Sequence, residues 1–250
     1  PLYSSAASDV YKRQVGNIVF FMDDGAFYRA AGNVERLPCT VLDYVFSDMN
    51  KGARFKFFAA NNVEHNEVIW FYASSSSTEI NRYVTFNYAE NVWAVGTTSN
   101  NFTRTAWDDA PTLTNPLAAG KIDTTDKNYL YNHELGNLAD GTGFSAYIES
   151  ADIDLDPAGE QFMYLSKIIP DIEFQDSSNA NDTVSLVLKG RRYPNETQST
   201  LSTSALTAAT NYKNTRGRTR QVAVRIENAD GDFKWRLGDT RFEIRPDGAK

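Results

Sequence analysis

The sequence predicts an all-β protein, a partial and degenerate β-propeller of antiparallel meanders followed by a C-terminal β-sandwich-like portion. Short runs of aromatic and β-branched residues recur between clusters of Gly, Asn, Asp and Ser, which is typical of strands joined by turns. Helical spacing of apolar residues is clearest at residues 40–50, and that segment is short. The meanders share an order of apolar strand, turn and aromatic strand, but their spacing is irregular. This favours degenerate propeller blades over a strict repeat, with a sandwich alone as the alternative.

Residues 67–96 form the clearest of these units. Residues 67–72 are almost wholly apolar, and residues 74–81 are a polar breaker. Residues 82–88 then alternate, and a further apolar run occupies residues 92–95. Alternation with period two between polar turns predicts a three-stranded antiparallel meander.

The elements before this meander are shorter. In chain order we predict strands at 17–21 and 26–29, a helix at 40–50 and a strand at 54–59, with turns at 23–25, 31–33 and 61–62. The Asp24-Gly25 pair suits the positive φ angles of a tight hairpin.

After the meander, the sequence predicts a polar connection containing Trp107 and an irregular stretch at 109–120. Further strands are expected at 129–132, 144–155 and 162–174, with a loop at 136–143, and Pro170 indicates an edge or a bend. Residues 176–182 form a linker-like turn, and residues 197–214 form a long exposed excursion. The C-terminal strands alternate most cleanly, and their apolar faces comprise Val184, Leu186 and Leu188; Val222, Val224 and Ile226; Phe233, Trp235 and Leu237; and Phe242 with Ile244.

These elements divide the chain into three segments. Residues 15–175 form the propeller-like region, truncated at its N-terminus, and residues 176–250 form the sandwich-like region. Residues 1–14, PLYSSAASDVYKRQ, resemble translated sequencing adapter found at the ends of metagenome-derived reading frames. That resemblance implies that the native chain begins near Val15 and that an upstream part is missing.

The net charge of −7 is unevenly distributed along the sequence. Residues 1–175 contain 12 Lys and Arg against 23 Asp and Glu, whereas residues 176–250 contain 13 against 9. One interpretation is two solvated surfaces of different composition. The other is that the acidic part repels nucleic acid while the basic part meets an acidic partner.

The sequence predicts no catalytic, cofactor-binding or metal site. Cys39 is the single cysteine, which excludes a disulfide framework, and no apolar run is long enough for a transmembrane helix. With His65 and His133 as the only histidines, a structural zinc site is not expected. Phosphate-loop, dinucleotide and nucleophile-elbow motifs are absent from the sequence.

Three features leave a functional interpretation open. Asp152, Asp154 and Asp156 have the spacing that opens a calcium loop, but Pro157 and Met163 occupy positions that need Gly and Glu, so solvent-facing side chains on a strand are favoured over a weak cation site. Aromatic residues such as Trp107 suit sugar stacking, although packing in the core is favoured. The run of alternating arginines at residues 216–220 suits phosphate contact or a solvated strand start.

Several segments together resemble the tail nozzle family of short-tailed bacteriophages, also described as tail tubular or packaged-DNA stabilisation proteins. These segments are EVIWFYASSSSTEINRYVTFNYAENVWAVG, RTAW, YLYNHELG, AYIESADIDL, QFMYLSKIIPDIEF, LKGRRYPN, RGRTRQVAVRIEN and WRLGDTRFEIRPDG. They follow one another in order between residues 15 and 250.

The resemblance implies a structural protein of the virion and not an enzyme, with no cofactor. It implies a homohexamer below the portal and adaptor rings, in contact with tail fibre proteins, that retains packaged double-stranded DNA and passes it without sequence-specific binding. Its place is the phage tail, after assembly in the host cytoplasm, with no membrane contact. Some of the acidic excess is expected to face the channel, because an acidic lumen does not adhere to DNA. The alternative from another class is a carbohydrate-binding or glycoside-cleaving β-propeller, which paired carboxylates in a pocket would favour.

Overall fold

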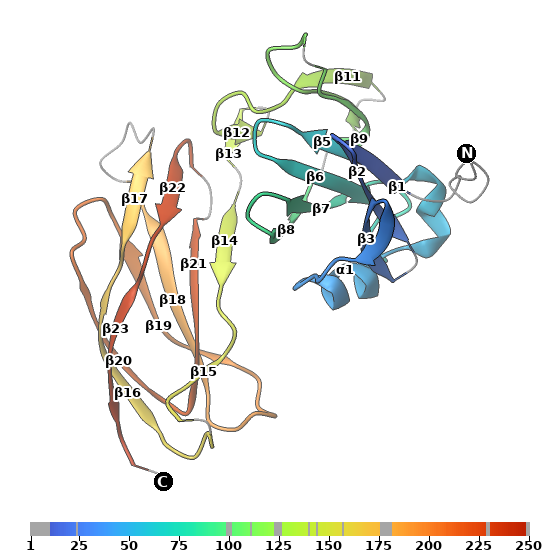
Figure 1. The fold of residues 1–250 in the computed structure, drawn as a ribbon. Helices are drawn as coiled ribbons and strands as arrows, with labels where there is room; N and C mark the ends of the chain where they lie inside the picture. Colours follow the sequence, from blue (N-terminus) through green and yellow to red (C-terminus); the bar gives the residue numbers. More distant parts are fainter. Residues whose placement is uncertain are drawn as a thin grey trace. The chain divides into compact units, whose positions relative to one another are not determined.

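The computed structural model divides the chain into two compact units, unit 1 (Pro1–Leu135) and unit 2 (Gly136–Lys250), which are described separately (Figure 1). The structure describes residues 11–23, 25–98, 102–110, 112–122, 127–139, 141–143, 145–156, 158–175, 182–228 and 231–248. Within this part of the chain, no helix is both long enough and apolar enough to cross a membrane.

Unit 1 consists of three successive antiparallel meanders and two short helices. The first meander contains β1 (Tyr11–Val15), β2 (Ile18–Asp23), β3 (Ala26–Ala31) and β4 (Asn33–Arg36). The helices α1 (Leu42–Asp48) and η1 (Lys51–Lys56) follow. The second meander contains β5 (Phe58–Asn62), β6 (Glu67–Tyr72), β7 (Arg82–Asn87) and β8 (Val92–Thr97), and the third contains β9 (Phe102–Asp108), β10 (Leu117–Ile122) and β11 (Lys127–Asn132).

The second meander packs against its neighbours with both faces. On one face, Trp70 and Trp93 lie 4.9 and 4.6 Å, between ring centroids, from Phe27 of β3. On the other face, Phe71 lies 6.1 Å from Trp107 of β9. The first strands of the three meanders also approach one another, β1 against β5 and β5 against β9. Successive meanders therefore stack face to face, with their first strands adjacent.

Unit 2 is a sandwich of two antiparallel layers. After a small hairpin of β12 (Leu138–Ala139) and β13 (Thr142–Gly143), one sheet has the order β14 (Ala146–Glu149), β21 (Gln221–Asn228), β18 (Val184–Arg191) and β19 (Ser199–Leu206), and β15 (Ile153–Asp154) also pairs with β21. The other layer has the order β20 (Lys213–Thr219), β16 (Met163–Ile169) and β23 (Arg241–Pro246), continued by the pair β17 (Ile172–Gln175) and β22 (Lys234–Leu237). The buried core between the layers is mainly aliphatic, with Leu165 and Ile168 from one layer and Leu186, Leu188 and Ile226 from the other.

The structure confirms the all-β class, and its described sheets are open. The propeller portion stays a prediction, since three meanders do not close a ring. The strands predicted within residues 67–96 are present, with β8 extending to Thr97. Pro170 does mark a break, because β16 ends at Ile169 and Gly238 N–H donates to the Asp171 carbonyl at 2.7 Å where the ladder resumes.

The division between the units differs from the predicted boundary at 175/176. It falls between residues 135 and 136, because β14, β16 and β17 pair with strands beyond residue 200: β21, β20 and β23, and β22. The sequence alone did not indicate this boundary, because strands that pair in one sheet come from both sides of residue 175. Residues 176–181 of the predicted linker lie outside the described residues.

Residues 11–14, set aside above as adapter-like, belong to β1 and pair with β2, while residues 1–10 lie outside the described part. Their adapter origin stays a prediction. Three local predictions were wrong. Residues 54–56 lie in η1, where the Asn50 side chain accepts from Gly52 N–H at 3.0 Å. Trp107 lies in β9, and the irregular stretch at 109–120 contains the first residues of β10. The expected excursion at 197–214 contains β19 and the start of β20.

Candidate functional site

The three aspartates of the calcium-like motif do not converge. Asp152 forms an ion pair with Arg191 and accepts from Gln198 Nε2 at 2.7 Å, whereas Asp154 accepts from Gln221 Nε2 at 3.3 Å. Asp156 accepts from the backbone N–H groups of residues 158 and 161. Among the described residues no group of three or more His, Cys, Asp or Glu could hold a metal ion, and Pro157 lies outside them.

The arginines at residues 216–220 lie on and just after β20. Arg218 forms an ion pair with Asp247, and its guanidinium lies 4.0 Å from the Phe162 ring centroid. Arg220 lies 4.6 Å from the same ring, at the corner where β20 passes into β21. These arginines lie at the end of β20 and not at the strand start that the sequence predicted. The aromatic support accounts for Arg218 and Arg220 structurally, and phosphate contact stays a prediction.

The charge asymmetry of the sequence does not follow the two units. Unit 1 contains 11 Lys and Arg against 15 Asp and Glu, and unit 2 contains 14 against 17, so their net charges are −4 and −3. In unit 2, acidic side chains from before residue 176 bind basic side chains from after it. Glu149 accepts from Lys189 Nζ at 2.7 Å and from Arg225 Nη1 at 3.0 Å. At least part of the acidic partner expected for the basic region is therefore the chain itself.

His65 belongs to a polar cluster at one end of the second and third meanders. His65 Nε2 lies 3.1 Å from Glu134 Oε2, and Asn62 Nδ2 donates to Glu134 Oε1 at 3.1 Å. Burial raises the pKa of Glu67, while His65 opposes and Glu134 adds to that rise. Because about 70 residues separate its members, the cluster had no sequence signal beyond the residue types.

The other histidine, His133, packs against residues of the third meander. Its ring centroid is 4.6 Å from that of Trp107, and its Nε2 accepts from Arg104 Nε at 2.9 Å. Burial, together with the charge of Arg104, lowers the pKa of His133 to about 4. Accepting from a guanidinium requires an unprotonated Nε2, so this histidine is held in its neutral form at neutral pH, with its ring proton on Nδ1.

Cys39 is not an activated nucleophile, because burial raises the pKa of its thiol to about 11.

The tryptophans of unit 1 tie the meanders together. Trp70 Nε1 donates to the Tyr11 carbonyl at 3.1 Å, Trp93 Nε1 to the Pro38 carbonyl at 2.9 Å and Trp107 Nε1 to the Asn61 carbonyl at 2.7 Å. All three side chains are buried. Packing is thus their role in this unit, as the sequence favoured for Trp107.

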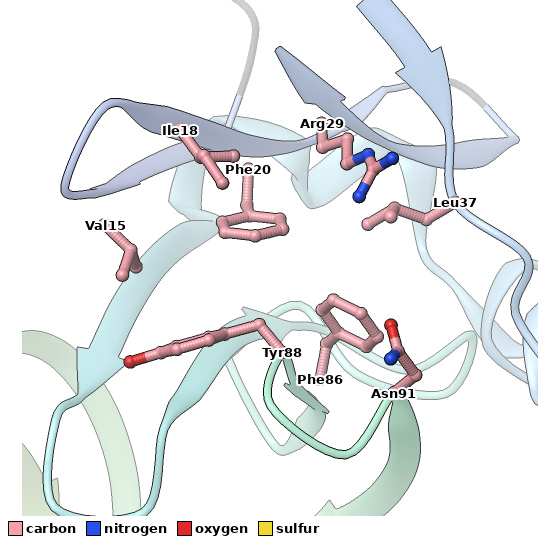
Figure 2. Close-up of a pocket in the computed structure, with 8 residues that line it drawn as sticks. All are labelled: Val15, Ile18, Phe20, Arg29, Leu37, Phe86, Tyr88 and Asn91. Atoms are coloured by element: carbon pink, nitrogen blue, oxygen red, sulfur yellow. The ribbon is translucent and has the colours of Figure 1, made fainter. Parts of the chain in front are cut away.

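A pocket of about 110 Å³ opens between the first and second meanders (Figure 2). The first meander and the segment after it contribute Val15, Ile18, Phe20, Arg29 and Leu37, and the second contributes Phe86, Tyr88 and Asn91. Phe20 lies 5.9 Å from Phe86 and 6.0 Å from Tyr88, between ring centroids. Sequence reasoning did not predict this pocket, because its residues come from four separate stretches of chain.

No protein-family model and no curated protein matches the chain. Two solved structures that are weakly similar are crystal structures of variants of an exo-beta-1,3-galactanase from Phanerochaete chrysosporium with beta-1,3-galactotriose. Each is 7% identical over 94% of this chain and 67% of that chain, with a TM-score of 0.27. A likeness of this size does not indicate a shared function.

Proposed function

We propose that this chain is a structural virion protein of a phage tail nozzle and not an enzyme. As a homohexamer it would extend the portal and adaptor channel, retain packaged DNA and pass it during ejection. The observation that carries the proposal is the order of motifs in the chain together with the architecture they form. Three meanders stacked face to face are followed by a sandwich, which is the arrangement expected for a propeller sector and its C-terminal portion.

The contacts within unit 1 suit a mechanical role. Arg13 of β1 donates from Nε to the Ala59 carbonyl at 2.6 Å and from Nη2 to the Trp107 carbonyl at 3.5 Å. One side chain therefore joins the first strands of all three meanders. With the indole bonds, it fixes neighbouring sheets to one another without a continuous hydrogen-bonded ladder among the described strands.

The ion pairs reduce the number of carboxylates that could form the proposed acidic channel surface. Carboxylates such as Glu149 and Asp152 have basic partners within unit 2, so they contribute little net field. Carboxylates of unit 1 such as Glu35, Glu79 and Asp48 are paired in the same way, so we expect the channel-facing carboxylates to be those without a basic partner, in either unit. An acidic wall would let DNA slide, because each Lys or Arg contact with phosphate tightens binding through counterion release.

Mass photometry and negative-stain microscopy of the recombinant chain, alone and with portal and adaptor proteins of a short-tailed phage, test the proposal. We expect a sixfold ring of six times the 28.0 kDa chain mass, formed alone or on the adaptor. A particle that stays monomeric with both partners and cleaves or binds glycans would overturn it. The glycosidase alternative requires paired carboxylates in a pocket, and none of the eight residues lining the described pocket is Asp or Glu.

A further inference from the structure

The pocket between the first and second meanders has an apolar end and a polar side. Phe20, Phe86 and Tyr88 provide ring faces and edges, and Val15 and Ile18 provide methyl groups. Figure 2 shows the Arg29 guanidinium and the Asn91 amide extending into the same space from opposite sheets. An apolar recess with a few convergent polar groups is the usual form of a small-molecule site.

The size of the pocket limits what enters it. A dry engineered cavity of about 150 Å³ holds benzene, so the observed volume of about 110 Å³ suits a smaller group. A branched alkyl group of roughly three or four carbons is of that scale. Water is a poor occupant of the apolar end, because Phe20, Phe86 and Ile18 offer it no hydrogen-bond partner from their side chains.

At the polar side of the pocket, the positive charge of Arg29 favours a negatively charged group on the ligand. Glu35, its cross-strand neighbour, accepts from Nε at 2.9 Å and from Nη2 at 2.6 Å, both through Oε2. These bonds use two of the five guanidinium N–H groups. The side chain is about half exposed, at 50%, so the remaining donors can reach a second carboxylate. Asn91, whose backbone φ of 58° turns the chain at this point, adds an amide N–H.

We propose that this pocket binds short branched-chain carboxylates, with the alkyl group among Ile18, Phe20 and Phe86 and the carboxylate on Arg29 and Asn91. The inference stands apart from the proposed nozzle role. A bound carboxylate would bridge two sheets whose other contacts are made by side chains. It would therefore stabilise unit 1 by mass action, as any ligand of the native state does.

Methyl-resolved NMR of the labelled full chain, titrated with 3-methylbutanoate at neutral pH, tests the site. Val15, Ile18 and Leu37 place methyl groups on the pocket wall, so their resonances should shift together and saturate. Acetate, which lacks the branched alkyl group, should give no shifts, and 3-methylbutan-1-ol, which lacks the charge, should bind about tenfold more weakly. No saturable shift with the carboxylate, or equal binding of the alcohol, would overturn the proposal.

Variants locate the binding within the pocket. Ile18→Phe should fill the recess and abolish binding, while Arg29→Gln should weaken it about tenfold. Glu35→Gln should tighten binding about threefold, because the guanidinium is no longer shared. Arg36→Gln is the matched control. It removes the same charge from an exposed residue of the edge strand β4, at a position that does not line the pocket. Equal weakening by Arg29→Gln and Arg36→Gln would show a general charge effect and overturn the site.

Discussion

In unit 1 the contacts between sheets are made by aromatic rings and indole N–H groups, whereas in unit 2 the two layers enclose a mainly aliphatic core. Unit 1 fixes the angle between meanders through directional bonds such as Trp93 to the Pro38 carbonyl. Unit 2 has an ion-pair network across three strands of one sheet, in which Glu149 of β14 binds Arg225 of β21 and Lys189 of β18. The comparison shows that the contrast between acidic and basic stretches of the sequence reflects strands that come together in one sheet of unit 2. The high aromatic content of unit 1 instead reflects the packing of one sheet against the next.

The largest expected effect is on the aromatic packing of unit 1. Trp93 is 8% exposed and contacts Phe27 and Phe86, each at 4.6 Å between ring centroids. Trp93→Ala should lower the free energy of unfolding of unit 1 by about 3–5 kcal/mol, measured by urea denaturation. Trp235 is the one tryptophan of unit 2, so a Trp235→Phe background confines the fluorescence to unit 1. Val92→Ala, at a 54% exposed neighbour, is the control. A loss below about 1 kcal/mol for Trp93→Ala would contradict the packing role.

The units should next differ in their response to mild acid. Because the pKa of His133 is lowered from 6.5 to about 4, the unfolded chain binds a proton there first as the pH falls. Unit 1 should lose stability between about pH 6.5 and pH 4, by at most about 3 kcal/mol. The raised pKa of Glu67 opposes this loss, since protonating Glu67 stabilises the folded state.

Thermal unfolding of unit 1 against pH measures this effect. His133→Gln keeps an acceptor for Arg104 but removes the titrating imidazole, so the slope between pH 6.5 and pH 4 should flatten. The same slope in the variant as in the parent chain would show that another group causes the loss.

A smaller effect is expected from the ion pairs of unit 2. Burial alone would raise the pKa of Glu149, but hydrogen bonds from Lys189 and Arg225 lower it overall. A lowered carboxyl pKa contributes stability above the unfolded value of about 4.3, and that stability is lost as the pH falls below it. Glu149→Gln should cost about 1–2 kcal/mol at neutral pH and nothing further in acid. Chemical denaturation of unit 2, followed through Trp235, measures it, with the exposed Glu160→Gln as control. Equal costs for the two variants would argue against a specific network.

The smallest expected effect sharpens the assignment of the aspartates. Because Asp152 and Asp154 already have side-chain partners, millimolar Ca²⁺ should leave the melting temperature of unit 2 unchanged within about 1 °C. Calorimetry with and without chelator checks this. A clear rise with Ca²⁺ that disappears in Asp156→Asn would restore the cation site.

The sequence predicted the parts of the fold whose signal is local. Residues 67–97 combine a buried apolar run, a polar breaker and alternating strands, so period and turns agreed. Residues 197–214 were predicted as an exposed excursion because Ser and Thr dominate there. In the structure Leu201 packs over Gly190 and Gly217, with Cδ1 2.7 and 3.3 Å from where a Cβ would stand, and Ser202 and Thr215 share a hydroxyl hydrogen bond of 3.0 Å. Those partners lie on other strands, so no window of sequence contains the reason for β19.

The candidate sites could be predicted only as residue types. That His65 meets Glu134, and that Arg29 and Asn91 face one pocket, depends on how meanders stack. Stacking is decided by side chains from strands that are distant in sequence, such as Phe27 and Trp93. The negative expectation for the aspartates was better founded, because the spacing required of a calcium loop is itself local.

The Arg13 contacts also bear on how such a unit changes over time. Each described meander completes its own ladder, and only side chains cross from β1 to β5 and β9. A substitution at such a crossing can alter the angle between two sheets without disturbing a strand in either. The angle between stacked meanders therefore depends on the side chains at these crossings, and relatives could vary it there without altering the pairing within any sheet.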